Sequence, residues 1–190
     1  GKTSLAKLIA GLEEPTSGNI ILDGEDITSL DITERANKGI SYAFQQPVRF
    51  KGITVRDLLE LAAGKKIEEK EICSLLGKVG LCTRDYIDRE VNSSLSGGEI
   101  KRIEIATVLA RNTKLTIFDE PEAGIDLWSF NELIDAFVEI KENYAGTLLI
   151  ISHQERILNI ADEIVVIANG VVKNIGKKEE ILPTLLEVSN

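Results

Sequence analysis

The sequence predicts an α/β fold with a mostly parallel central sheet. Short apolar runs typical of buried strands, such as residues 115–118 and 147–151, alternate with longer segments of helical apolar spacing, such as residues 127–141. Glycine-containing turns punctuate this alternation. No apolar run reaches the roughly 18 residues that a membrane-spanning helix needs, so the sequence predicts no such helix.

The chain is expected to begin with a helix that ends near Gly11. The residues on its apolar side are Leu5, Leu8, Ile9 and Leu12. The elements expected next, in chain order, are a hairpin around Asp23-Gly24 that starts with residues 19–22, a short helix at 32–38, a buried strand at 40–44 and a helical stretch from 54 to about 88.

The second half is expected to continue the strand–helix alternation. After the strand at 115–118, the helix at 127–141 and the strand at 147–151, a second hairpin is predicted because residues 164–168 and 171–175 flank Asn169-Gly170. A last helix at 177–187 carries apolar residues on one side.

Composition restricts the class of partner. A chain of 190 residues is long enough for one domain with a hydrophobic core. Its formal net charge of −9 disfavours nucleic acid, because phosphate-binding surfaces are basic. Cys73 and Cys82 lack the spacing of a CxxC motif and have no ligand residues nearby, which indicates reduced thiols in a cytosolic protein.

Two motifs carry most of the chemical information. Residues 94–99 read SLSGGE, a glycine-rich turn that opens a helix, and a helix N-terminus favours an anion such as phosphate. Residues 115–121 read LTIFDEP, an apolar strand that ends in Asp119 and Glu120. One carboxylate can bind Mg²⁺ and the other can orient water, which is what ATP hydrolysis requires. The alternative role of Glu120 is that of a helix-capping acid after the strand.

The first residues, Gly1-Lys2-Thr3-Ser4, match the end of the phosphate-binding pattern G-x-x-x-x-G-K-[ST]. In such a loop, backbone N–H groups wrap the phosphates, Lys2 would reach the β and γ oxygens, and the Thr3 hydroxyl would contact Mg²⁺. The alternative is an ordinary polar helix N-terminus. The start of this pattern is expected to precede Gly1, and without it the chain is expected to bind ATP poorly.

In their order and spacing, these motifs resemble those of ATP-binding cassette (ABC) ATPases. The resemblance covers essentially the whole chain and implies one ABC ATP-binding domain at residues 1–190, with its N-terminal strands and the start of the P-loop missing. The implied fold is a P-loop NTPase of the ABC ATPase type. It would combine a RecA-like core, a helical subdomain at about residues 50–110 and a small antiparallel β part.

The resemblance also implies a Mg²⁺-dependent ATPase with ATP as its nucleotide. Gly1, Lys2, Thr3 and Ser4 would bind the nucleotide phosphates. Thr3 and Asp119 would contact Mg²⁺, and Glu120 would hold the attacking water as general base.

Two further residues match catalytic positions of the family. Gln45 follows the strand at 40–44 and matches the family's Q-loop, where its amide would reach Mg²⁺ or the attacking water; the adjacent Gln46 is the alternative. His153, the only histidine, follows the strand at 147–151 and matches a switch histidine that meets the γ-phosphate. A lone histidine can also be purely structural.

A second subunit is implied by the glycine-rich turn. In the family, Ser96, Gly97 and Gly98 would bind the γ-phosphate held by another copy, so that two chains pack head to tail. Asp126 matches the loop that crosses that interface, and an N-cap role for Asp126 is compatible with this.

The subfamily has two candidate assignments. Residues 43–47, 86–92, 97–102 and 153–158 resemble the ATPase subunit of the Suf iron–sulfur cluster assembly system, whose partner is a scaffold protein. This is the assignment favoured from the sequence, with a cytoplasmic location. The alternative is the ATP-binding subunit of a membrane transporter, placed at the inner face of the membrane with a permease as partner. Leu95 and Pro121-Glu122 depart from the Suf pattern.

Overall fold

The computed structural model describes residues 1–43 and 51–188. In chain order its helices and strands are α1 (Lys2–Ala10), β1 (Ile21–Leu22), β2 (Glu25–Asp26), α2 (Ile32–Asn37), β3 (Ile40–Ala43), α3 (Val55–Ala63), α4 (Glu69–Lys78), α5 (Thr83–Tyr86), α6 (Gly97–Arg111), β4 (Leu115–Asp119), α7 (Leu127–Asn143), β5 (Thr147–Ile151), α8 (Glu155–Asn159), β6 (Glu163–Ala168), β7 (Val171–Lys177) and α9 (Lys178–Val188).

The central sheet is parallel, as the sequence predicts. Its strand order is β3-β4-β5, and the register pairs Tyr42 with Ile117 and Phe118 with Ile150. All three carboxyl ends therefore lie at the same edge of the sheet. The described part of β3 ends at Ala43, so the last residue of the predicted strand lies outside the described residues.

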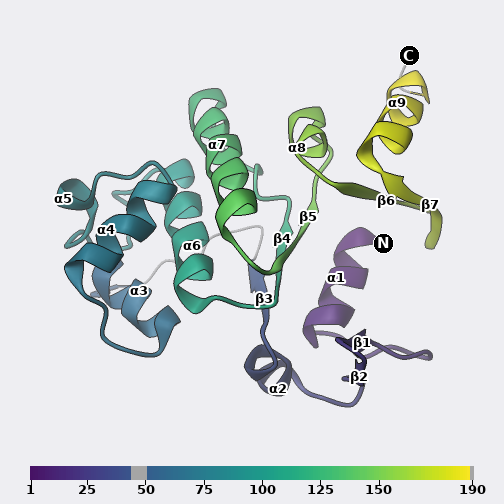
Figure 1. Ribbon diagram of the computed structural model, residues 1–190, viewed down its shortest axis with the longest axis horizontal. Helices are drawn as coiled ribbons and strands as arrows, with labels where there is room; N and C mark the ends of the chain where they lie inside the picture. Colours follow the sequence, from purple (N-terminus) through teal and green to yellow (C-terminus); the bar gives the residue numbers. More distant parts are fainter. Residues whose placement is uncertain (44–50, 189–190) are drawn as a thin grey trace.

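Residues of β4 alternate between two hydrophobic cores, because successive strand side chains point to opposite faces. Ile117 packs in a cluster with Ala6 and Ala10 of α1. Phe118 packs in the larger cluster with residues of α6 and α7, where its ring meets Phe137 edge-on at a centroid distance of 5.2 Å. Helix α1 thus covers one face of the sheet, and α6 and α7 cover the other (Figure 1).

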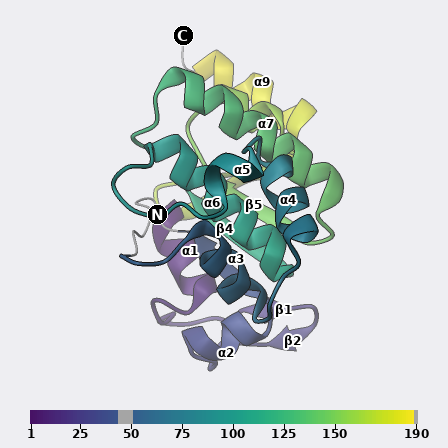
Figure 2. The same ribbon diagram turned by 90° about the vertical axis from the view of Figure 1, so that its left-hand side faces the viewer.

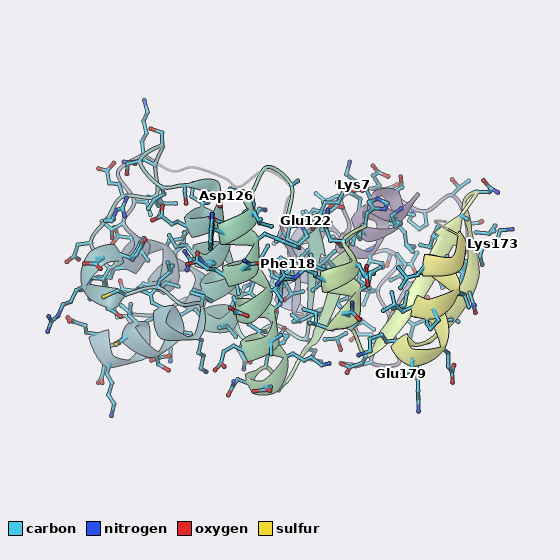
Figure 3. All side chains as sticks on the ribbon, turned by 90° about the horizontal axis from the view of Figure 1, so that it is seen from above. Lys7, Phe118, Glu122, Asp126, Lys173 and Glu179 are labelled. Atoms are coloured by element: carbon cyan, nitrogen blue, oxygen red, sulfur yellow. The ribbon has the colours of Figure 1, made fainter. Side chains whose placement is uncertain are left out.

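Two groups of elements extend the molecule on the two sides of this sheet. The helices α3, α4 and α5 pack beside α6 at one end, and the hairpin β6-β7 with α9 forms the other end (Figures 1 and 2). Seen from above, the long axis runs from these helices to α9 (Figure 3). Within residues 1–43 and 51–188, no helix combines the length and apolar character needed to cross a membrane.

Both predicted hairpins form around left-handed turn residues. Asp23 and Gly24 have φ of 49° and 81°, and Asn169 and Gly170 have φ of 54° and 76°. Positive φ at both central residues is the type I′ pattern that matches the twist of paired strands, which explains the Asp-Gly and Asn-Gly sequences. The structure thereby confirms the antiparallel parts as well as the parallel core.

Two stretches differ in detail from the predicted elements. The predicted helical stretch at 54 to about 88 consists of three helices, the first of which ends at Gly64 with a φ of 68°. The short helix α8 was not among the predicted elements, because five residues give too little apolar periodicity to recognise.

Candidate active site

The N-terminus of α1 meets the carboxyl end of β4. Asp119, which is 5% exposed, accepts a hydrogen bond from the Thr3 hydroxyl, with 3.2 Å between Thr3 Oγ1 and Asp119 Oδ1. The contact follows from the strand alternation, since Asp119 shares the face of Ile117 and that face packs against α1. Two motifs separated by most of the chain are therefore in direct contact.

The other residues of the first motif lie at the same helix end. Gly1 is the N-cap of α1, and its carbonyl accepts a bond from the N–H of Leu5. Lys2 is half-buried and Ser4 is exposed. The first N–H groups of a helix have no partners inside it, so this end offers backbone donors and one lysine ammonium to an anion.

Glu120 is held in an unusual backbone conformation directly after β4. Its φ is 47°, in the left-handed region, and its N–H donates to the carbonyl of Ile151 on β5. Its carboxylate Oε1 lies 3.6 Å from Nε2 of His153, which follows β5 and is 68% exposed. The two candidate catalytic side chains therefore meet across the ends of adjacent strands.

The oxygen ligands at this place fit a Mg²⁺–nucleotide complex. Among residues 1–43 and 51–188 there is no group of three or more His, Cys, Asp or Glu side chains able to enclose a metal ion. Asp119 and Thr3 supply one carboxylate and one hydroxyl close together. Mg²⁺ is commonly bound in this way, with phosphate and water oxygens completing its octahedron.

Sequence reasoning missed one member of this site. The hydroxyl of Tyr42 on β3 donates to Asp119 Oδ2 at 2.8 Å. Burial raises the pKa of Tyr42 above its usual range, and the bond to Asp119 adds to this effect. The alternation of strand residues 40–43 could have revealed it, because this alternation puts Tyr42 on the same face of the sheet as Ile117, the face that α1 covers. We call Thr3, Tyr42, Asp119, Glu120 and His153 the strand-end site. Gln45 and Gln46 lie outside the described residues.

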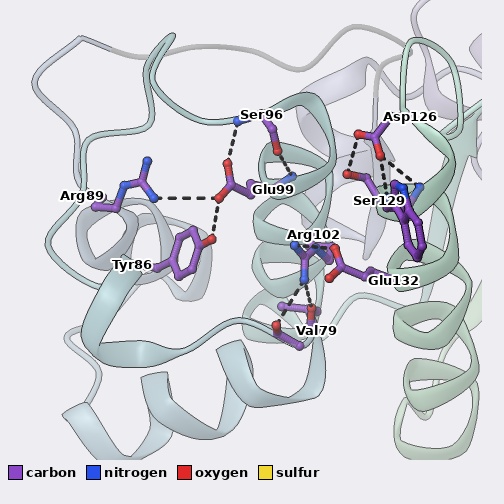
Figure 4. Close-up of polar contacts among 11 residues, drawn as sticks. Val79, Tyr86, Arg89, Ser96, Glu99, Arg102, Asp126, Ser129 and Glu132 are labelled. Carbon is purple, nitrogen blue, oxygen red and sulfur yellow. Dashed lines mark hydrogen bonds and ion pairs between the residues drawn. The ribbon is translucent and has the colours of Figure 1, made fainter.

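The glycine-rich turn forms the N-terminus of α6. Ser96 is the N-cap, its hydroxyl oxygen accepts from the N–H of Glu99, and the Glu99 carboxylate accepts from the N–H of Ser96 (Figure 4). This reciprocal capping box satisfies two end groups of the helix. Gly97 and Gly98 occupy the first two helical positions.

Glu99 has a second set of partners that the sequence did not reveal. The Tyr86 hydroxyl donates to its Oε1, Arg89 lies 3.9 Å from the same oxygen, and the Arg89 guanidinium stacks 5.1 Å from the Tyr86 ring centre (Figure 4). Burial alone would raise the pKa of Glu99, but the hydrogen bonds from Tyr86 and Ser96 outweigh it and lower that pKa. The segment before the turn is thereby tied to α6.

Asp126 caps α7 beside this turn. Its carboxylate accepts from the N–H groups of Trp128 and Ser129 and from the Ser129 hydroxyl (Figure 4). The two helix starts approach closely, since a Cβ on Gly98 would lie 2.3 Å from Ser129 Cβ. Only glycine fits at that position. We call Ser96, Gly97, Gly98 and Asp126 the helix-start site.

The strand-end site and the helix-start site are built by different elements. The first adjoins α1 and the second belongs to α6 and α7 (Figure 1). One copy of the chain thus holds two separate groups of predicted site residues.

The chain is similar to known proteins over most of its length. A family model described as ABC transporter matches residues 1–123. An uncharacterized ABC transporter ATP-binding protein of Methanocaldococcus jannaschii is 40% identical over 189 residues, covering 95% of this chain and 75% of that protein. The sulfate/thiosulfate import ATP-binding protein of Synechocystis sp. is 34% identical over 192 residues, covering 95% of this chain and 51% of that protein. The chain thus spans about half the length of the second relative.

A solved structure shows the same fold. The ADP conformation of an ATP-binding cassette of an ABC transporter superimposes with a TM-score of 0.80 at 28% sequence identity, covering 98% of this chain and 80% of that one.

Proposed function

Because the chain belongs to the ABC transporter family, whose ATP-binding domains hydrolyse ATP with Mg²⁺, we propose that it is the ATP-binding subunit of a membrane transporter. The observation that carries this proposal is the contact between Thr3 and Asp119, with Glu120 and His153 beside it. These residues match the phosphate-loop threonine, the metal-binding aspartate, the general base and the switch histidine of the family.

The strand-end site would position the nucleotide and the attacking water. Lys2 and the N–H groups at the start of α1 bind the phosphates, and Thr3 and Asp119 hold Mg²⁺, which when bound neutralises phosphate charge. Glu120 holds a water and accepts its proton. His153, 3.6 Å from Glu120, keeps that carboxylate beside the γ-phosphate.

The helix-start site would act on the nucleotide of a second copy. The N–H groups of Gly97 and Gly98 open α6, and their helix dipole favours the γ-phosphate of the partner's ATP. Asp126 would lie at the interface between the copies. Each site of one copy would then act on a different nucleotide.

A groove next to β3 fits the contact with the transporter's membrane subunit. It has a volume of about 530 Å³ and is lined by α3 and α6, with Leu58, Ile103 and Val108 among its apolar residues and Glu104 and Arg111 among its charged ones. Leu61, at its margin, is 69% exposed. Its helices belong to the helical region at about residues 50–110. The subunit would then work at the cytoplasmic face of the membrane.

The relatives support the transporter alternative and give no support to the iron–sulfur assembly role favoured from the sequence. Some of the residues on which the iron–sulfur assembly role was based have a local structural function instead. Tyr86, Arg89 and Glu99 hold each other and the turn at Ser96, whatever the partner is. These residues therefore do not distinguish a transporter permease from an iron–sulfur scaffold protein as the partner, and an experiment has to make that distinction.

The test is to tag the protein in its native cells and identify the proteins that co-purify after mild detergent extraction. Recovery from membranes with a multi-helix permease supports the proposal, and Leu61→Glu should release that partner while leaving Mg²⁺-dependent ATP hydrolysis by the purified protein intact. A soluble complex with an iron–sulfur scaffold protein would overturn the transporter role. Absence of Mg²⁺-dependent ATP hydrolysis by the protein isolated from its native cells, which carries the whole phosphate-binding loop, would overturn the proposed chemistry itself.

A further inference from the structure

The carboxylate of Asp119 accepts hydrogen bonds on both of its oxygens. Thr3 Oγ1 donates to Oδ1 at 3.2 Å, and the Tyr42 hydroxyl donates to Oδ2 at 2.8 Å. Asp119 is 5% exposed, so little bulk water competes for these oxygens. The two donors come from a helix and from a neighbouring strand, and together they fix the plane of the carboxylate.

The register of the sheet explains why Tyr42 can reach this carboxylate. Tyr42 pairs with Ile117, and Asp119 lies two residues further along β4 on the same face. Two residues of strand span about 7 Å. A tyrosine side chain directed along the strand covers such a distance, and a shorter hydroxyl-bearing side chain at the same position would not.

We propose that Tyr42 is a positioning residue of the hydrolytic site, whose hydroxyl orients the Asp119 carboxylate for metal binding. This inference rests on the proposed function, because it takes Asp119 as the Mg²⁺ contact. In this role Tyr42 acts through Asp119.

The hydrogen-bond capacities are consistent with this role. An ionised carboxylate has about four acceptor positions, and Thr3 and Tyr42 occupy one on each oxygen. Each oxygen keeps capacity for a metal ion or a metal-bound water. The Thr3 hydroxyl can also bind a cation through its oxygen while its single O–H continues to donate to Asp119. Tyr42 therefore holds the carboxylate without blocking it.

The test compares Tyr42→Phe with the wild type, both with the whole phosphate-binding loop, by titrating Mn²⁺ into the complex with a non-hydrolysable ATP analogue and following free Mn²⁺ by electron paramagnetic resonance. Phenylalanine keeps the aromatic ring, which packs on the face of the sheet that α1 covers, and removes only the hydroxyl. Partners that orient metal ligands typically change metal affinity by roughly 10- to 100-fold, and a loss in this range is expected. Binding of the analogue in EDTA should stay unchanged.

The same variant should show a specific kinetic pattern. The Mg²⁺ concentration for half-maximal ATP hydrolysis should rise with the loss of Mn²⁺ affinity, and saturating Mg²⁺ should restore most of kcat. A structural defect alone would lower kcat at every Mg²⁺ concentration.

Tyr144→Phe is the matched control. The Tyr144 hydroxyl is bonded to the carbonyl and the hydroxyl of Thr113, at the opposite end of β4. Its removal should lower the unfolding temperature and leave Mn²⁺ affinity unchanged. Wild-type Mn²⁺ affinity in Tyr42→Phe would overturn the inference. Unchanged Mn²⁺ affinity in Asp119→Asn would instead overturn the metal assignment of the proposed function, so the two failures are distinguishable.

Discussion

At the carboxyl end of β4, Asp119 takes its hydrogen bonds from Thr3 and Tyr42, which are 116 and 77 residues away along the chain. At the start of α6, Ser96 and Glu99 are three residues apart and bond to each other. The strand-end site therefore depends on correct assembly of the sheet and α1, whereas the capping of the helix-start site is encoded within one helical turn.

The two sites also differ in the groups they present. The strand-end site offers side chains that can hold a metal ion and accept a proton. The helix-start site offers backbone N–H groups and glycines. Under the proposed function, this difference assigns the chemistry to the first site and a phosphate-binding shape and helix dipole to the second. Substitutions at the first should change turnover with little effect on stability, and substitutions at the second should change stability and turnover together.

The largest effect is expected for Glu120→Gln. Loss of a general base lowers the rate by roughly 10²- to 10⁴-fold, and ATP hydrolysis should fall by that factor. ATP affinity and the unfolding temperature should stay near wild type, because glutamine has the same shape. The measurement is steady-state phosphate release with Mg²⁺. Glu155→Gln, an exposed charge change on α8, is the control, and near-normal hydrolysis by Glu120→Gln would refute the assignment.

Gly98→Ala should produce the next largest effect, and mainly on stability. The added Cβ would lie 2.3 Å from Ser129 Cβ and 2.6 Å from its Oγ, which forces α6 and α7 apart. Overpacking of this kind costs about 1–3 kcal/mol in the free energy of unfolding, measurable by urea denaturation.

Gly77→Ala is the matched control for that prediction. Gly77 lies in α4 and a Cβ there would have nothing within 4 Å. An alanine in a helix interior is about 0.5–1 kcal/mol better than glycine, so this variant should be slightly more stable. Equal stability of Gly98→Ala and the wild type would show that the two helix starts are not tightly packed.

Ser96→Ala should cost about 1 kcal/mol, because the N–H of Glu99 loses the hydroxyl oxygen that caps it. Ser96→Asn keeps a capping oxygen and should recover most of the loss. Thermal unfolding of the three proteins measures the difference. An unchanged unfolding temperature in Ser96→Ala would mean that the capping box does not contribute to stability in solution.

The smallest effect is expected in the pH dependence of stability. Because the pKa of Glu99 is lower in the folded state, its contribution is complete above its ordinary value of 4.5 and is lost as the pH falls through the folded-state value. Glu99→Gln should therefore unfold more easily at neutral pH and lose less further stability in acid. Identical acid profiles for the two proteins, followed by circular dichroism, would exclude this role of Glu99.

Local sequence determined much of the architecture. Asp23-Gly24 and Asn169-Gly170 specify their hairpins because only certain residues adopt positive φ readily. Apolar strands between amphipathic helices predicted the parallel sheet, and the pair at Ser96 and Glu99 encodes its own helix start. The family could likewise be recognised from motifs that are each contiguous in the chain.

Only the tertiary structure decided which residues of the separate motifs contact each other. Whether Thr3 and Tyr42 reach Asp119 depends on strand register and on which face α1 covers. That Gly98 must be glycine depends on the approach of Ser129 from α7. Periodicity and turn chemistry are properties of a few consecutive residues and so can be read from the sequence. Contacts between distant residues depend on how all the elements pack at once, and only the folded chain reveals them.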